Sequence, residues 1–587
     1  EHLEDIETRS QILSNIYAEF SILPELTFRT SFGANYSNTR RDRFENQIIV
    51  RTGTPRGENW NSQSLNWINE NIISYNKSFG NSNIGLIAGV TSQKQEDKSS
   101  YIRGTGFAND YVSTLNAASS WIANTGMSEW SLLSYLSRAT YSYADKYIVT
   151  ASVRKDGSSR FGANTKWGLF PSISGGWRID QEDFMKSIGI VSQAKLRASW
   201  GKTGNNNIGN YSSIAAMGTS AYLLGISESI SSGAQPSNIS NPNLGWERTA
   251  TVDLGLDLGL FEGRVTLSTD YYNSQTTDLL LNVPVTAITG FTNEIQNIGK
   301  VENKGWEFEL STINTVGAVR WSSNVNLSFN QNKVVQLGNN NAPIVTGDWW
   351  DNSNITTVGH PIGSFFVYKQ TGVYNTQQEI DASPHVNGTR PGDVIIEDFN
   401  EDGVINADDR QIFGSNIPKY YFGLTNRVSF KGFELSVFLH GLGGNQIFNS
   451  IGREFDRPVD SHKNHYSHWA NRWRSPEEPG DGMTPRATNN ATGASNEWSN
   501  RYLYDGAFVR LRNVTLGYTF PDRLLKNLDL TNLRVYVQGE NLYIWDDFGV
   551  GFTPEVDLTN GDPTKAGRDY GVYPTPRTFL IGLSVSF

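Results

Sequence analysis

The feature that most constrains this chain is a two-residue alternation of apolar and small polar side chains, which is clearest in residues 579–587. Apolar residues take every second position there, with Gly582, Ser584 and Ser586 between them: Phe579, Ile581, Leu583, Val585 and Phe587. In a β-strand successive side chains point to opposite faces, so this segment has one apolar and one polar face. Both the edge of a β-sandwich and the closing strand of a barrel in lipid need such a strand. The segment alone leaves both structures open.

The same alternation recurs along the chain. Clear examples lie at 26–32, 84–90, 147–153, 251–258, 264–271, 422–430, 433–439 and 533–540. The total is roughly seventeen segments, many near the ten residues that a tilted membrane strand needs. The short link 261–263 joins two of them and predicts a β-hairpin. The chain is therefore predicted to be all-β.

The connections between these segments alternate between short and long. Short links at 23–25, 144–145, 261–263 and 431–432 alternate with long polar stretches near 95–129, 203–247, 331–416 and 441–505. A sandwich does not require this order, whereas an outer-membrane barrel has short periplasmic turns and long external loops. The loop pattern therefore favours a transmembrane antiparallel β-barrel.

Composition excludes several other classes of protein. No apolar run approaches the roughly 18 residues of a membrane helix. The net charge of −10 argues against nucleic acid as a partner, because phosphate binding needs a basic face. There is no cysteine, and hence no disulfide framework or thiolate nucleophile. The chain starts at Glu1 without a basic and apolar leader, as expected of a cytoplasmic protein or of a mature or truncated product.

Several stretches together resemble one protein family. They are DGSSRFG at 156–162, FPSISGGW at 170–177, and further motifs at 196–205, 241–247, 297–305, 508–518, 539–542 and 573–577. These motifs resemble, in the same order, those of SusC/RagA-type TonB-dependent transporters of the Bacteroidota outer membrane. The resemblance spans nearly the whole chain.

The resemblance implies a fold and a set of partners. Family members are similar to barrels of about 22 strands with a plugged lumen. Because no plug, TonB box or signal is visible, residues 1–587 are expected to be the C-terminal part of such a barrel, without the plug and the first strands. The implied partners are membrane lipid, a SusD-like lipoprotein, the plug with the TonB system, and a glycan or peptide substrate.

The sharpest local motif lies at 398–409. It places side-chain oxygens at positions 1, 3, 5, 9 and 12 and glycine at position 6, as in a Ca²⁺-binding loop with aspartate in place of the final glutamate. The predicted ligands are Asp398, Asn400, Asp402, the Val404 carbonyl and Asp409, with Asn406 acting through water. The alternative is a metal-free Asx turn in an external loop. A structural Ca²⁺ that holds the long loop is predicted.

Other candidate sites are weaker. His462, His465 and His468 recur every third residue near Asp456 and Asp460, but the stretch is better explained as loop packing than as a metal site. Trp349 and Trp350 could stack on a sugar ring, but loop packing explains them better.

Catalysis is not predicted. The chain has no nucleophile elbow, phosphate-cradling glycine motif or zinc-hydrolase helix. Asp253 and Asp257 share one strand face, which lumen-facing charges in a barrel explain without chemistry.

The predicted function is TonB-dependent import of a bulky nutrient across the outer membrane, in which a SusD-like lid captures the substrate and TonB displaces the plug. Two alternatives stay open. One is a barrel that serves as a structural subunit of an envelope complex, and the other is a soluble all-β carbohydrate-binding or hydrolytic protein.

Overall fold

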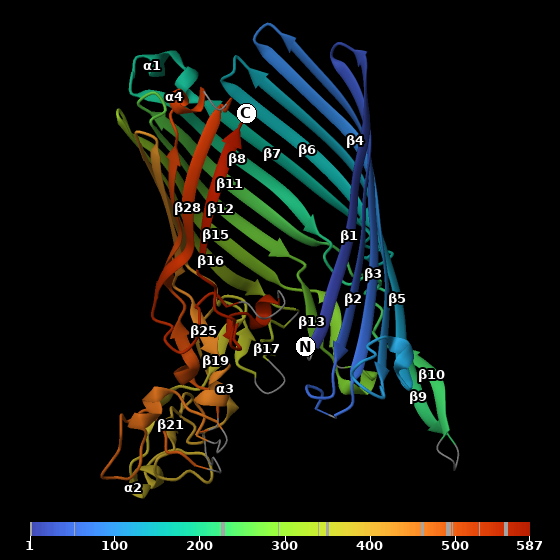
Figure 1. Ribbon diagram of the computed structural model, residues 1–587, viewed down its shortest axis with the longest axis vertical. Coiled ribbons are helices and arrows are strands. Elements are labelled where there is room, and N and C mark those ends of the chain that lie inside the picture. Colours follow the sequence, from blue (N-terminus) through green and yellow to red (C-terminus); the bar gives the residue numbers. More distant parts are fainter. Residues whose placement is uncertain are drawn as a thin grey trace. The chain divides into compact units, whose positions relative to one another are not determined.

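The computed structural model describes residues 3–51, 53–224, 229–291, 293–338, 340–347, 352–458, 463–488, 495, 497–526, 529–556 and 562–587. Strands dominate, and the largest sheet contains 17 of them (Figure 1). This agrees with the roughly seventeen alternating segments expected of a barrel-forming chain. None of the helices in the described ranges combines the length and the hydropathy needed to cross a membrane.

The chain divides into two compact units. The first comprises residues 1–177, 198–251 and 276–298, and the second 178–197, 252–275 and 299–587. Strands β8 (Val191–Asn205), β11 (Glu247–Leu260) and β12 (Val265–Thr277) each have part of their residues in one unit and the rest in the other.

The first unit is a run of long antiparallel strands, each paired with the next in sequence. They are β1 (Leu3–Leu23), β2 (Leu26–Glu45), β3 (Arg56–Phe79), β4 (Ser82–Thr105), β5 (Ser120–Tyr143), β6 (Tyr147–Ser158) and β7 (Trp167–Arg178). Two separate hairpins are β9 (Met217–Leu224) with β10 (Ser229–Pro236), which Figure 1 shows, and β13 (Leu280–Pro284) with β14 (Asn293–Asn297).

The second unit carries the remaining strands of the large sheet. They are β15 (Lys300–Val316), β16 (Val319–Gln336), β23 (Tyr420–Phe430), β24 (Phe433–Gly443), β27 (Phe508–Thr519), β28 (Asn532–Asp546) and β30 (Thr578–Ser586). Each pairs antiparallel with its neighbour in that order. Lys431 and Gly432, both at positive φ, form the two-residue turn between β23 and β24, as a tight hairpin requires.

The connections of the second unit are folded. The stretch between β16 and β23 holds β17 (Ile344–Thr346), β18 (Asn354–Thr356), β19 (Ser364–Val367), β20 (Gln370–Val373), α2 (Gln377–Asp381), β21 (Val394–Ile396) and β22 (Gln411–Gly414). Later connections hold β25 (Gln446–Asn449), α3 (Gly452–Phe455), β26 (Leu503–Asp505), α4 (Asp522–Leu525) and β29 (Arg568–Asp569), and α1 (Asp183–Lys186) precedes β8. Phe365, Val367, Phe448 and Tyr502 form a buried core among these pieces.

One predicted loop is wrong in its extent. The stretch near 95–129 was expected to be a long connection, but β4 continues to Thr105 and β5 begins at Ser120. Residues 95–100 of β4 are polar on both faces, with an ion pair of 2.8 Å between Lys94 and Glu129. In the first residues of β5, Trp121, Ile122 and Met127 stand among polar residues without regular alternation. The alternation is therefore lost at both strand ends, and the pattern could not show that the strands continue.

The apolar face predicted for the last strand is exposed. In β30, Phe579, Ile581 and Leu583 are 72%, 83% and 65% exposed. A water-soluble protein rarely leaves such a contiguous apolar row uncovered, whereas lipid-facing strands do so as a rule. The expectation that a plug and the first strands are missing finds no support in the structure.

Candidate functional site

The predicted Ca²⁺ loop is a compact acidic turn. Asn400, Asp402 and Val404 are exposed, and Gly403 at its sixth position has φ +83°, which glycine adopts without strain. The backbone N–H of Gly403 donates to Asp398 Oδ2 at 2.9 Å, and that of Val404 donates to Asp402 Oδ1 at 2.8 Å. Hydrogen bonds of this kind, from backbone N–H groups to Asp side chains, are common to the predicted Ca²⁺ loop and to the metal-free Asx turn.

Asp409, the last predicted ligand of this loop, already accepts hydrogen bonds from the backbone of the loop itself. Asp409 is fully buried at the end of the 3-10 helix Ala407–Asp409. Its two carboxylate oxygens accept hydrogen bonds from the backbone N–H groups of Phe399 and Asn406, at 2.9 and 2.7 Å. Across the described ranges no group of three or more His, Cys, Asp or Glu side chains is arranged to hold a metal ion. The Ca²⁺ ion remains a prediction.

The histidine-rich stretch forms a buried hydrogen-bonded cluster around Asp456. The Asp456 carboxylate accepts from His468 Nε2 at 2.6 Å, Trp469 Nε1 at 2.8 Å and Arg501 Nη2 at 2.6 Å. His465 stacks on Trp469 instead of joining it. Predicted members His462 and Asp460 lie outside the described residues, as do Trp349 and Trp350. The described part of this stretch is a packing centre, as the loop interpretation predicts.

The electrostatics of this cluster favour an ionised carboxylate. Burial by itself raises the pKa of Asp456, but hydrogen bonds from His468 and Arg501 and the charge of Arg501 outweigh it, so the pKa lies below its ordinary value. Burial also raises the pKa of the neighbouring Tyr504 to about 12. The cluster therefore carries a permanent buried ion pair at neutral pH.

The strand carboxylates are held by an arginine that the motif search did not identify. Arg197 on β8 donates to both oxygens of Asp257, each at 2.9 Å, and lies 2.8 Å from Asp270 Oδ1. Arg197 is 60 residues from Asp257 and 73 from Asp270 in the sequence, and this separation hid the partnership. Asp257 is thus part of an ion-pair network within the sheet and not part of a catalytic pair.

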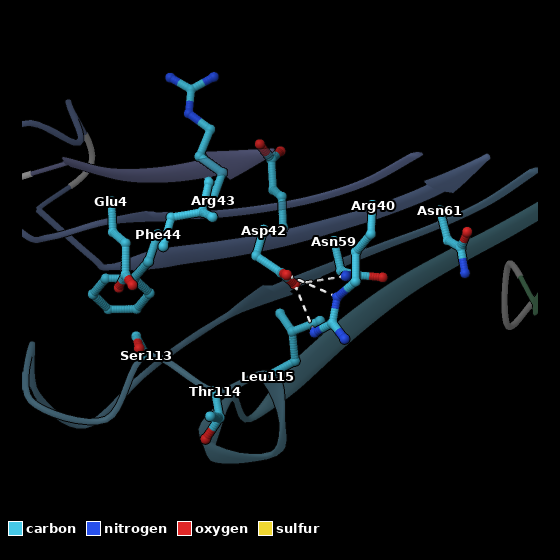
Figure 2. A pocket seen from close by; sticks show the side chains of 12 residues that line it. Glu4, Arg40, Asp42, Arg43, Phe44, Asn59, Asn61, Ser113, Thr114 and Leu115 are labelled. Atoms are coloured by element: carbon cyan, nitrogen blue, oxygen red, sulfur yellow. Dashed lines mark hydrogen bonds and ion pairs between the residues drawn. The ribbon is translucent and has the colours of Figure 1, made fainter. Parts of the chain in front are cut away.

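The first unit contains a polar cavity of about 570 Å³ near the ends of β1, β2 and β3. Figure 2 shows Asp42 at its centre, where it accepts hydrogen bonds from Arg40 at 2.8 Å and from Asn59 at 2.6 Å. Leu115 and Thr114, from the connection between β4 and β5, form part of its wall. Because Arg40 and Asp42 neutralise each other, the centre of this cavity presents no net charge.

The second unit contains a cavity of about 590 Å³ that the sequence did not indicate. Its wall comes from strands β23 and β24 and from three connections far apart in the chain: Asn416, Pro418, Tyr421, Leu442, Asn445, Pro554, Glu555, Val556, Asp562, Pro563 and Ala566. Glu555 lies 2.6 Å from Arg510 and 3.4 Å from His440. No local motif joins these residues, so only the folded chain could reveal the cavity.

Comparison with known proteins identifies the family. Residues 5–542 match the family described as TonB dependent receptor-like, beta-barrel. The chain is 32% identical to the TonB-dependent receptor P3 of Formosa agariphila over 98% of its own length and 58% of that protein. It is 29% identical to the TonB-dependent receptor SusC of Bacteroides thetaiotaomicron, over 97% of its own length and 55% of that receptor.

A solved structure shares the fold. The chain superposes on the RagAB peptide transporter with a TM-score of 0.87 at 21% identity, and covers 100% of its own length and 62% of that chain. The chain thus spans 58%, 55% and 62% of the length of these three proteins. The chain belongs to the TonB-dependent receptor β-barrel family, with SusC-type relatives, and is therefore an outer-membrane protein.

Proposed function

We propose that the protein imports a bulky nutrient, a glycan or a peptide fragment, across the outer membrane with energy supplied through TonB. The observation that carries the proposal is the contrast between the two faces of the strands. One face bears exposed apolar rows such as Phe579, Ile581 and Leu583, and the other bears ion-paired polar groups such as Arg197 and Asp257. A lipid-facing wall around a polar lumen has this arrangement. Membership of the receptor family supports the same function.

We propose that the 17-stranded sheet forms part of a closed transmembrane barrel of about 22 strands. A plug gates the lumen, and TonB moves the plug. A SusD-like surface lipoprotein covers the external side and holds the substrate between itself and the long connections. The similarity to SusC and to the RagAB peptide transporter supports these partners. Many weak polar contacts in the lumen then allow release as well as entry of the substrate.

Uptake in living cells tests the import function. Cells that carry the protein are given fluorescent oligosaccharides and peptides, with TonB present or deleted. Accumulation that requires both the protein and TonB supports import. Equal accumulation without the protein contradicts it, and a protein that captures no surface lipoprotein during detergent purification contradicts the proposed lid.

We also propose that the turn at 398–409 binds one structural Ca²⁺. Its ligands are the oxygens of Asp398, Asn400, Asp402, the Val404 carbonyl and Asp409, which are the hard donors that Ca²⁺ prefers. Gly403 supplies the sharp turn that such loops need. Calorimetry with millimolar Ca²⁺ should show binding that is lost in Asp402→Ala. Absence of binding, with unchanged proteolytic protection of the loop in that variant, would end the proposal.

A further inference from the structure

A cavity of about 390 Å³, here called the Arg138 hollow, lies against β3, β4 and β5 of the first unit. Gly85 of β4 lines it between its two cross-strand partners, Asn76 of β3 and Thr140 of β5. A Cβ atom at position 85 would lie 3.1 Å from Asn76 Oδ1, so the glycine keeps this space open. The hollow has the size of pockets that hold a small molecule or one unit of a polymer.

The hollow lies on the face of the sheet opposite to the apolar rows. Leu86 of β4 and Tyr141 of β5 are exposed apolar residues of the other face. Gly85 and Thr140 point away from them, because successive side chains alternate along a strand and cross-strand partners share a face. The hollow is close to the short turns that follow β3 and β5. In the proposed barrel it therefore faces the lumen near the periplasmic end.

The lining of the hollow on this face carries amides, hydroxyls and one charge. Its polar side chains are Asn76, Ser78, Asn83, Thr140, Ser142 and Arg138. No aspartate or glutamate is among the described residues that line it. Lys77 also borders the hollow, but it belongs to the other face of β3, and its ammonium lies 3.9 Å from the Glu25 carboxylate. The charge that the hollow presents is therefore the positive charge of Arg138.

Arg138 is exposed and makes no ion pair or hydrogen bond with any residue in the described part of the chain. Other arginines on the same face of this unit are paired: Arg41 with Asp5 at 2.5 Å, Arg56 with Glu45 at 2.6 Å, and Arg154 with Asp156 at 2.7 Å. The guanidinium stays charged at any physiological pH. The hollow thus holds a cationic fork of N–H donors for which the described chain supplies no acceptor.

The chemistry of this lining favours a carboxylate. A carboxylate accepts two parallel N–H bonds from one guanidinium, and such charged pairs are stronger than bonds between neutral groups. The hydroxyls and amide NH₂ groups around Arg138 can donate to the same oxygens. An amine would be repelled by Arg138, and a neutral hydroxyl would leave its charge unpaired.

We propose that the Arg138 hollow binds a carboxylate group of the imported nutrient, from an acidic peptide or from a glycan that contains uronic acid. This inference rests on the proposed import function, whose nutrient it characterises further. Arg138 donates to both carboxylate oxygens, and the space over Gly85 holds the residue or sugar ring that carries them. An ion pair exposed to water is weak, so the site also releases the nutrient.

Calorimetry on the detergent-solubilised protein tests the proposal. The probes are acetyl-Gly-Glu-Gly-amide with its glutamine analogue, and digalacturonate with its dimethyl ester, in which both carboxylates are neutral. At least one acidic probe should bind, with its neutral analogue at least about tenfold weaker, which corresponds to about 1.4 kcal/mol. The probe that binds identifies the source of the carboxylate.

Two variants locate the bound carboxylate. Arg138→Gln removes the charge and should weaken the acidic probe at least about tenfold; because Arg138 has no partner among the described residues, the fold should stay intact. Gly85→Val keeps Arg138 but fills the hollow, and should also abolish most of the binding. Lys98→Gln, which removes a positive charge from the other face of β4, is the matched control and should change nothing.

The outcomes separate this proposal from the import function. If no acidic probe binds, or if each neutral analogue binds equally well, the hollow does not recognise a carboxylate. Equal binding by Arg138→Gln or by Gly85→Val overturns the assignment to this hollow. Because calorimetry needs neither TonB nor a lid, a failure of uptake with intact binding would refute import alone, and uptake without binding would refute the hollow alone.

Discussion

The strands β1 and β30 and the folded connections between β16 and β27 place their apolar side chains in opposite environments. On β1, Ile12 and Ile16 are 64% and 71% exposed, whereas Phe365 and Phe448 in the connections are fully buried. We assign the exposed strand residues to lipid, where exposure of apolar side chains costs nothing. The connections have a buried core of their own, as chain segments in water need. One chain therefore follows two sets of burial rules, and each set predicts a different response to substitution.

The largest expected effect is in the core of the connections. Phe448 packs with Phe365, Trp498 and Tyr502, and Phe448→Ala should destabilise this region by about 4 kcal/mol because it leaves a cavity. Limited proteolysis of residues 444–507 should accelerate strongly. Unchanged cleavage would mean that these connections do not share a core.

Removing the buried charge of Asp456 should cost nearly as much. Asp456→Asn keeps the size of the side chain but leaves Arg501 without its charged acceptor, at a cost of about 3 kcal/mol. Hydrogen exchange of the peptides that contain His468 and Arg501 should report the loss. The exposed aspartate Asp381 is the control, and an equal response in Asp381→Asn would show that the effect is not specific to burial.

Low pH should destabilise the cluster around Asp456 as Asp456→Asn does, because it protonates the same carboxylate. The pKa of Asp456 is lower in the folded protein than the roughly 3.9 of a free carboxyl group, so its contribution is full above that pH. The contribution is lost as pH falls through the lower folded value. Pepsin cleavage within 444–507 should rise below about pH 4 in the native protein and depend less on pH in Asp456→Asn.

A substitution on the strands tests the lipid environment. Ile581→Arg places a charge on the apolar face of β30 and should destabilise the folded protein in lipid by about 2 kcal/mol. Ser586→Arg, on the opposite face of the same strand, should be nearly neutral. Denaturant titration in lipid vesicles measures both, and equal costs on the two faces would disprove the lipid assignment.

The smallest effect is expected where a strand end is exposed to water. Lys98 is paired with Glu96 at 2.5 Å but has a side chain that is 54% exposed, so Lys98→Ala should change stability by less than about 0.5 kcal/mol. The same denaturant titration applies. A large loss would indicate that this end of β4 is buried by a partner.

Much of the sheet could be predicted from residues close together in the sequence. The alternation at 579–587 predicted β30 with its apolar face, and the pattern at 422–439 predicted the hairpin of β23 and β24. The limits of β4 and β5 could not be predicted, because β4 is polar on both faces at 95–100 and the start of β5 shows no regular alternation. The acidic motif at 398–409 predicted a sharp turn, but not that Asp409 would be buried and bonded to the backbone.

The sequence by itself determined the strand pattern, the apolar faces and the family resemblance, because side-chain direction in a strand depends only on position along the chain. The tertiary structure alone decided which side chains from distant parts of the sequence come into contact. Arg568 reaches Asn354 across 214 residues, Asp456 pairs with Arg501, and Asn416 joins Asp562 in the wall of the cavity of about 590 Å³. Such meetings depend on how the connections pack together, and no local periodicity encodes that packing.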